Sequence, residues 1–375
     1  MDFALTEEQQ AVVELTRRIL GDRCTPEHLT QVEAGADWFD RTTWQALAEA
    51  DLMGLTLPES QGGGGYGWFE ACLLLTEVGR AVAHVPLWST LVASHAIATY
   101  GTDEQQARWL PGVASGKTVL AVALAEAAAP DRLPMVTARR DGSTWSLSGV
   151  CTTVTAAHLA DVLLVPTLAD GEVELLAVPL DTPGVTVERQ DTFSHEPQSQ
   201  VTFDEVRVGP EAHLDLDGAG IEPLLQRAVI GWCAIASGVA EVGMRLTAAY
   251  VSERQQFDRA LGTFQAVGQR MADCYIDAAA IELTMLAAAS ELDAVGAEGS
   301  VAPNLVAVAK YWSSYGGSRI GHADLHLHGG ISIDLDYPIH RYFLWAKHLE
   351  FQLGVATEQL ASIGRRLAQR PVLAG

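Results

Sequence analysis

The spacing of hydrophobic and polar positions along this 375-residue chain changes twice. Apolar residues first recur every three to four positions, as in amphipathic helices, then alternate every second position, as in half-buried strands, and finally return to helical spacing. The changes fall near residues 118 and 220. We therefore predict a helical domain at 1–117, a β domain at 118–220 and a helical domain at 221–375. This order gives an α+β fold class, with a sheet inserted between two helical units.

The first unit is predicted to consist of consecutive helices. Thr6 is followed three residues later by Gln9, which fits a capping box for a helix that continues to Leu20. Further helices are expected at 41–51, 68–82, 87–100 and 103–115. The glycine run at 61–65 is interpreted as a turn between helices, since glycine tolerates backbone conformations that other residues avoid.

The other two units differ in the length of their elements. Short strand-like runs separated by turn residues occupy 136–139, 145–147, 162–166, 173–179, 185–189 and 201–208. Long helices are expected at 224–254, 264–292, 302–327 and 338–370. Four consecutive long helices indicate a C-terminal four-helix bundle.

Composition and charge then narrow the possible functions. Apolar residues make up 48% of the chain and charged residues 19%, which excludes a disordered chain. The net charge of −23 argues against non-specific binding to nucleic acid or to an anionic membrane surface. The longest apolar run, 228–240, is shorter than the ~20 residues of a membrane span and is expected to be a buried helix. Five cysteines without a CxxC pair, and no visible leader, indicate buried thiols and a cytoplasmic location.

Several standard sites are not supported by the motifs. The chain has no phosphate-binding GxxxxGK[ST] loop, no GxGxxG between a strand and a helix, and no serine nucleophile elbow. The histidines of the segment 322–328 resemble a metal-ligand cluster, but no distant ligand completes the set that zinc requires. We expect no metal, and we interpret Gly329-Gly330 as the stop of a helix.

The segment Tyr250-Val-Ser-Glu-Arg-Gln-Gln-Phe-Asp is more distinctive, because a helix ends there in a charged and aromatic turn. The guanidinium of Arg254 could hold a diphosphate through two hydrogen bonds, and Phe257 could cover an aromatic ring. The alternative is a structural role for both residues, as an ion pair between helices and a core aromatic. The residues alone leave both interpretations open.

A wider set of motifs resembles the acyl-CoA dehydrogenase family over nearly the whole chain. The motifs are LTEEQQ at the start, Pro58-Glu59 with its glycines, VTFDEVRV at 201–208, YxxxRxxF at 250–257, Gln265 and HLHGG at 326–330. The resemblance implies an N-terminal helical domain, a middle β-sheet domain and a C-terminal four-helix bundle. It also implies FAD bound across a subunit interface, where one subunit holds the flavin ring and its neighbour reaches the diphosphate and adenosine.

The neighbour's half of that FAD site is largely retained. The family's glutamine before the glycine pair is histidine here, and imidazole can still donate a hydrogen bond to phosphate or ribose. The cofactor-binding residues that the resemblance implies are Arg254, Phe257, Gln265, His326, Gly329 and Gly330.

The flavin-ring half is degraded, and the catalytic base is absent. The loop at 125–131 lacks the family's Gly-Ser, and the segment 153–155 keeps a threonine but lacks the aromatic residue. Leu353-Gly354 stands where the family has Glu-Gly, and leucine cannot take the proton α to a thioester. Members with the base on the first C-terminal helix have an acid where this chain reads Gln226-Arg227. No residue of this chain is therefore predicted to be catalytic, although Glu350 could serve as a displaced base.

With one half of the FAD site retained and the other half lost, the chain resembles the base-less subunits of actinobacterial α2β2 acyl-CoA dehydrogenases of cholesterol side-chain degradation. The implied function is an FAD-dependent oxidoreductase of steroid and lipid degradation that introduces an α,β double bond into a CoA thioester. The implied partners are a base-bearing acyl-CoA dehydrogenase subunit that holds most of the acyl-CoA, and an electron-transfer flavoprotein-type acceptor. The chain is then expected to be inactive alone. Two alternatives remain: a self-sufficient homotetramer with a displaced base, and a flavin-free structural subunit.

Overall fold

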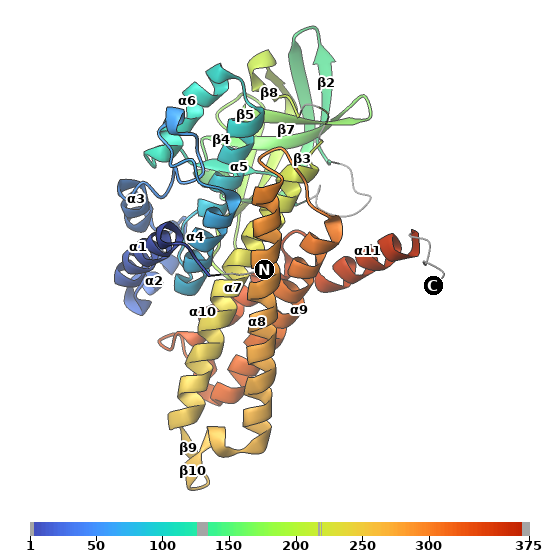
Figure 1. Cartoon of the computed structure of the whole chain (residues 1–375). Helices are drawn as coiled ribbons and strands as arrows, with labels where there is room; N and C mark the ends of the chain where they lie inside the picture. The colour runs from blue at the N-terminus through green and yellow to red at the C-terminus, as the bar shows by residue number, and fades with distance from the viewer. Residues whose placement is uncertain (1–3, 126–133, 217, 219, 370–375) are drawn as a thin grey trace.

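A computed structural model describes residues 4–125, 134–216, 218 and 220–369 of the chain. A helical unit is followed by a sheet and then by a second helical unit, whose long helices extend away from the sheet (Figure 1). This arrangement confirms the predicted α+β fold class.

The N-terminal helices are α1 (Glu7–Arg23), α2 (Pro26–Glu33), α3 (Arg41–Glu49), α4 (Trp68–Ala81), α5 (Leu87–Tyr100) and α6 (Asp103–Ala114). The capping box is confirmed: the side chain of Thr6 accepts from the backbone N–H of Gln9 at 3.2 Å, and Gln9 bonds back to Thr6. Helix α2 was not predicted, because it is only eight residues long and buries only Leu29, too little for a visible period.

The glycine turn after α3 is confirmed as well, around the short 3-10 helix η1 (Glu59–Gln61). A Cβ at Gly63 would lie 2.1 Å from the carbonyl oxygen of Leu57, so only glycine lets the chain fold back this tightly.

The middle strands are β1 (Leu120–Val122), β2 (Thr137–Asp141), β3 (Thr144–Thr155), β4 (Val162–Ala169), β5 (Glu172–Pro179), β6 (Val185–Gln190), β7 (Gln198–Val208) and β8 (His213–Leu214). They form one sheet in the order β6-β7-β3-β2-β4-β5-β8, with β1 parallel to β4. Strand β3 is longer than the predicted run at 145–147, because register shifts after Leu147 and Cys151 break its alternation.

The C-terminal helices are α7 (Glu222–Glu253), α8 (Gln265–Ala294), α9 (Pro303–His328), α10 (Ile339–Phe351) and α11 (Ala356–Gln369). The prediction of one helix over 338–370 is wrong. Leu353 and Gly354 have φ of 51° and 102°, and these left-handed residues separate α10 from α11. The expected bundle therefore has a fifth helix, α11, which packs on α9.

Helix α7 joins the two helical units. A Cβ at Gly79 would lie 2.0 Å from the carbonyl oxygen of Ile235, and one at Gly238 would lie 2.0 Å from that of Thr76, so glycines permit the close packing of α4 on α7. The run 228–240 is buried in α7, as predicted. Within the described residues α7 is the one helix that is apolar and long enough to cross a membrane, and 78% of its most apolar window is buried inside the protein.

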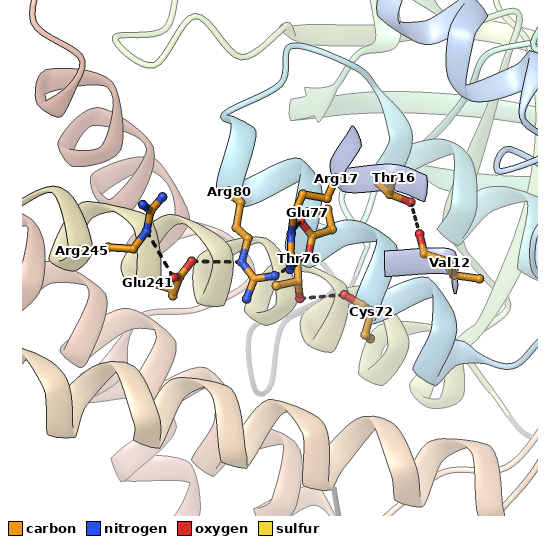
Figure 2. A network of polar contacts seen from close by, with 9 residues as sticks. All are labelled: Val12, Thr16, Arg17, Cys72, Thr76, Glu77, Arg80, Glu241 and Arg245. Carbon is orange, nitrogen blue, oxygen red and sulfur yellow. Dashed lines mark hydrogen bonds and ion pairs between the residues drawn. The ribbon is translucent and has the colours of Figure 1, made fainter. Parts of the chain in front are cut away.

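Charged side chains add a second link between α1, α4 and α7 (Figure 2). The buried carboxylate of Glu77 accepts from Arg17 at 2.9 and 3.0 Å and also binds Arg80. Arg80 in turn donates to Glu241 of α7 at 3.0 Å, and Glu241 lies 3.7 Å from Arg245. This network therefore links α1 through α4 to α7.

Candidate functional site

The first part of the candidate site is the connection between α7 and α8. Arg254 caps the C-terminus of α7, where its backbone N–H donates to Tyr250 at 2.8 Å and its carbonyl accepts from Leu261 at 2.8 Å. Its side chain is exposed, and no described residue pairs with the guanidinium. A fixed backbone with a free guanidinium is suited to an anion from outside this chain.

The aromatic residue of this connection lies at the tip of a hairpin between β9 (Gln255–Gln256) and β10 (Arg259–Ala260). Phe257 and Asp258 have φ of 55° and 64°, as a two-residue turn of the primed type requires. The ring of Phe257 is 86% exposed, so the predicted alternative of a core aromatic is wrong. Such exposure leaves the ring available to a ligand or to another subunit.

Gln265 is the first residue of α8, and its side chain is exposed. The residue before it, Phe264, provides no side-chain hydrogen bond to the helix start. The first N–H groups of α8 therefore add a partial positive charge beside Gln265, which favours an anion such as phosphate.

The second part of the candidate site is the C-terminal end of α9. His326 is exposed in the last turn, and the helix stops at Gly329, as predicted. Gly329 has φ 64° and ψ −141°, a conformation that is essentially restricted to glycine. A Cβ at Gly329 or Gly330 would meet no atom within 4 Å, so both glycines face open space.

Two side chains that sequence reasoning did not assign hold these parts together. The rings of Tyr250 and His328 stack with centroids 4.4 Å apart, and the Tyr250 hydroxyl donates to the His328 carbonyl at 3.3 Å. His328 also contacts the Tyr337 hydroxyl at 3.1 Å, and burial lowers the pKa of its imidazole. The sequence feature that could have identified Tyr250 is its position one helical turn before Arg254. The ends of α7 and α9 thus lie side by side, and the exposed side chains of Arg254 and His326 are at these two ends.

The residues aligned with the flavin-ring half gather elsewhere, in a cavity of about 500 Å³. Ala125, Thr153 of β3 and Leu353 of the α10–α11 junction all line it. The rest of the loop predicted at 125–131 lies outside the described residues. On one side of the cavity, the imidazole of His348 on α10 contacts the carboxylate of Glu196 in the β domain.

The carboxylate proposed as a displaced base does not line this cavity. Glu350 is held by Lys347 at 2.5 Å. Among the described residues, the carboxylates that line the cavity are those of Asp191, paired with Arg189 at 3.2 Å, and Glu358, which accepts from the Val355 N–H at 3.2 Å. Glu358 was missed because the break before α11, which brings it to the cavity, was not predicted.

The other possible position for a base, at the start of α7, is occupied by buried structural residues. Arg227 donates to the carbonyls of Pro223 and Gly299, both at 3.0 Å, and Gln226 donates to Val301 at 3.0 Å. Both side chains hold the α8–α9 connection. In the described part of the chain, no group of three or more His, Cys, Asp or Glu residues could hold a metal ion.

The two parts of the predicted FAD site lie far apart within one chain. His348, at the cavity, lies 6.0 Å from the ring of Trp232 on α7. Arg254 follows Trp232 by 22 residues, about 33 Å at the 1.5 Å rise of a helix. In Figure 1 the β9–β10 hairpin is accordingly at the end of the molecule opposite the sheet. Arg254 and this cavity therefore cannot serve the same dinucleotide.

Comparison with known families decides the identity of the fold. Residues 6–117 match the acyl-CoA dehydrogenase N-terminal domain, and residues 223–368 match the acyl-CoA dehydrogenase C-terminal domain. The chain belongs to the acyl-CoA dehydrogenase family. The resemblance inferred from the motifs is therefore confirmed, and the chain is a member of an oxidoreductase family.

One known sequence and two solved structures are similar to this chain over almost their whole length. The chain is 36% identical to acyl-CoA dehydrogenase FadE27 of Mycobacterium tuberculosis, covering 99% of this chain and 100% of that one. Its structure superposes on the ChsE4-ChsE5 complex of the same organism with a TM-score of 0.91 and 36% identity, covering 99% and 100%. It superposes on a variant of the Tcur3481-Tcur3483 steroid ACAD with a TM-score of 0.89 and 40% identity, covering 97% and 98%.

Proposed function

We propose that this chain is the base-less subunit of a heterotetrameric acyl-CoA dehydrogenase that desaturates a steroid side-chain CoA thioester. The observation that carries the proposal is the contrast between the two ends of the molecule. Free donors are presented where α7, α8 and α9 meet, whereas the distant cavity has Leu353 where the family carries its base.

The similar proteins support both the assembly and the substrate class. One similar structure is a complex of two differently named chains, and the other is described as a steroid ACAD. Both match this chain from end to end, so the likeness includes the C-terminal helices that carry the exposed half-site. The substrate proposed on this basis is a steroid CoA ester held mainly by the partner subunit.

In this proposal the chain contributes binding groups, and its partner contributes the base. Bound FAD would supply the hydride acceptor for the dehydrogenation. Arg254 and the start of α8 would neutralise the diphosphate, Phe257 would cover an aromatic face, and Gln265 and His326 would donate hydrogen bonds. Gly329 and Gly330 would let the dinucleotide approach the backbone, since no Cβ stands in the way.

The remaining assignments are also part of the proposal. Electrons would leave to an electron-transfer flavoprotein-type acceptor. A cytoplasmic location agrees with the five cysteines, none of which is in a disulfide and four of which are buried.

Expression of the chain alone and together with a base-bearing acyl-CoA dehydrogenase tests the proposal. We expect the chain alone to be colourless and inactive, and the co-purified complex to be yellow, with two FAD per α2β2 tetramer. Yellow protein with turnover from this chain alone would contradict the proposal and favour a homotetramer. A stable complex without any flavin would also contradict it, and would favour a structural subunit. A partner variant without its catalytic glutamate is the control, since it should keep the flavin and lose turnover.

A further inference from the structure

A second cavity lies among the helices that the charged network of Glu77 joins. It has a volume of about 560 Å³, and all the residues that line it belong to α1, α4, α7 and α10. Three of them are arginines, each from a different helix: Arg17, Arg80 and Arg245. The cavity is separate from the FAD half-site, because Arg245 precedes Arg254 by nine residues, about 13 Å along α7.

The charged side chains of this cavity form an alternating row of cations and anions (Figure 2). Glu77 lies between Arg17 and Arg80, and Glu241 lies between Arg80 and Arg245. The row begins and ends with an arginine, so three cations of the lining face two anions. This balance is the reverse of that of the whole chain, whose net charge is −23.

The free hydrogen-bond donors of the row are at its two ends. Arg17 donates through Nε and Nη2 to Glu77, which leaves its Nη1 without a described partner. Arg245 approaches Glu241 through Nε alone, at 3.7 Å, so neither of its Nη groups has a described partner. The side chains of Arg17 and Arg245 are 57% and 66% exposed, so these N–H groups are open to a solute.

The carboxylates of the row do not compete for a ligand, because arginines already bind them. Glu77 is 2% exposed and accepts from both Arg17 and Arg80, and Glu241 accepts from Arg80 at 3.0 Å. Guanidinium N–H groups that remain free bind an oxyanion. Glu241 is 38% exposed and would repel a doubly charged anion more than a singly charged one, so the row favours a monoanion.

Beside the row, the cavity has apolar walls and room for more than a bare ion. Leu20, Val242 and the ring of Tyr342 line it. The Tyr342 hydroxyl donates to the Arg80 carbonyl at 2.8 Å, so it is not a free donor. At about 560 Å³ the cavity is within the size range of small-molecule sites.

We infer that this cavity binds a small organic monocarboxylate. Its carboxylate accepts hydrogen bonds from the Nη groups of Arg245, and its apolar body lies against Leu20, Val242 and Tyr342. A bound acid contacts α1, α7 and α10 together, so it stabilises the packing of the N-terminal helices on the C-terminal bundle. Its binding requires neither flavin nor turnover and is independent of the proposed function.

Isothermal titration calorimetry with cyclohexanecarboxylate at constant ionic strength tests this inference, on the full chain alone and in the co-purified complex. We expect saturable binding in both, with one Arg245-dependent site for each copy of this chain. Arg245→Ala should weaken that site at least tenfold, since it removes the charge-assisted contact. Cyclohexanecarboxamide, which is of similar size but uncharged, should not bind, and cyclohexyl phosphate should bind more weakly than the carboxylate.

Arg18→Ala is the matched control, because Arg18 is an exposed arginine of α1 that does not line the cavity. It should bind the carboxylate like the wild type, and circular dichroism should show both variants folded. Equal affinity of wild type and Arg245→Ala would overturn the inference, as would equal binding of the carboxamide or tighter binding of the phosphate ester. Binding by the chain alone that the partner abolishes would also overturn it, since the partner would then fill the cavity. Arg245-dependent binding by a chain that never assembles refutes only the proposed function.

Discussion

At the scale of single residues, the half-site depends most on the free guanidinium of Arg254. Arg254 is an exposed cation at the end of α7. Because the whole chain has a net charge of −23, a negatively charged dinucleotide can be attracted only by cations close to it. The backbone of Arg254 is held at both sides by hydrogen bonds to Tyr250 and Leu261. A change of its side chain should therefore affect the ligand more than the fold.

We predict that Arg254→Ala lowers the FAD content of the complex. The change removes a charge-assisted contact worth roughly 1.5–3 kcal/mol, which weakens FAD binding at least about tenfold. Flavin absorbance per tetramer after gel filtration measures the effect. Arg245→Ala is the control, because Arg245 is another exposed arginine of α7 and lies nine residues before Arg254. Equal flavin loss in both variants would mean that Arg254 makes no specific contact.

A second residue-scale prediction concerns Leu353. Leu353→Glu should not create dehydrogenase activity in the chain alone, since the described residues that line the cavity around it include no lysine or arginine for a dinucleotide or a coenzyme A. Flavin-coupled dye reduction with a series of acyl-CoA esters measures this outcome. Leu353→Gln, which has the same size and no charge, controls for misfolding. Turnover by the glutamate variant alone would show that the flavin-ring half is intact.

At the scale of elements, the long periodic helices and the strands with turn residues were predictable, and the junctions were not. The expected helix over 338–370 has apolar positions on both sides of Leu353-Gly354, so its hydrophobic pattern gives no sign of a break. The break depends on the left-handed backbone conformation of these two residues. The residues of the half-site were assigned through motifs, and their role stays a prediction. The cavity with Gln198 and Glu358 was not, since it joins β7 to α11 only after the chain turns at Leu353.

The pairing of α7 with α9 gives a prediction for pH dependence. Burial raises the pKa of Asp324 on α9 to about 7, and its carboxylate accepts from Thr247 of α7 at 2.7 Å. Between about pH 4 and pH 7 the folded state therefore holds a proton that the unfolded state releases, so this group lowers stability as pH rises and has no further effect above pH 7.

Asp324→Asn should remove this pH-dependent loss of folding stability, which is on the order of 3 kcal/mol. Urea unfolding of wild type and variant at pH 5 and pH 8 measures it, and the variant should gain relative to wild type at pH 8. Asp273→Asn, at a side chain that is 56% exposed, is the control. An unchanged difference between the two pH values would contradict the prediction.

The charged network that joins α1, α4 and α7 gives another prediction at this scale. Glu77→Gln removes the buried carboxylate that binds Arg17 and Arg80, and should lower the free energy of unfolding by about 2 kcal/mol. Arg245→Ala, at the exposed end of the same network, should cost at most about 1 kcal/mol. Thermal unfolding followed by circular dichroism compares the two. A larger effect of Arg245→Ala would show that Glu77 is not the centre of the network.

At the scale of the whole molecule, the chain exposes apolar side chains that a monomer would bury. On α8, Ile276 and Leu283 are 60% and 50% exposed, and they lie seven residues apart on one face. Beyond the end of α9, Ile333 and Leu335 are 80% and 70% exposed. Exposed apolar surface of this kind marks a contact with another chain, and Ile333 and Leu335 follow shortly after the end of α9 that carries part of the half-site.

We predict that Ile276→Asp weakens co-purification with the partner subunit at least tenfold, because a charge on this face would be desolvated in the complex. Pull-down of the untagged partner by the tagged chain measures the loss, and flavin should disappear from the eluate with it. Met135→Asp is the control, since Met135 is similarly exposed at 57% but lies in the β domain. If Met135→Asp breaks the complex and Ile276→Asp does not, the partner binds the sheet. The half-site at the far end of α7 would then need a different explanation.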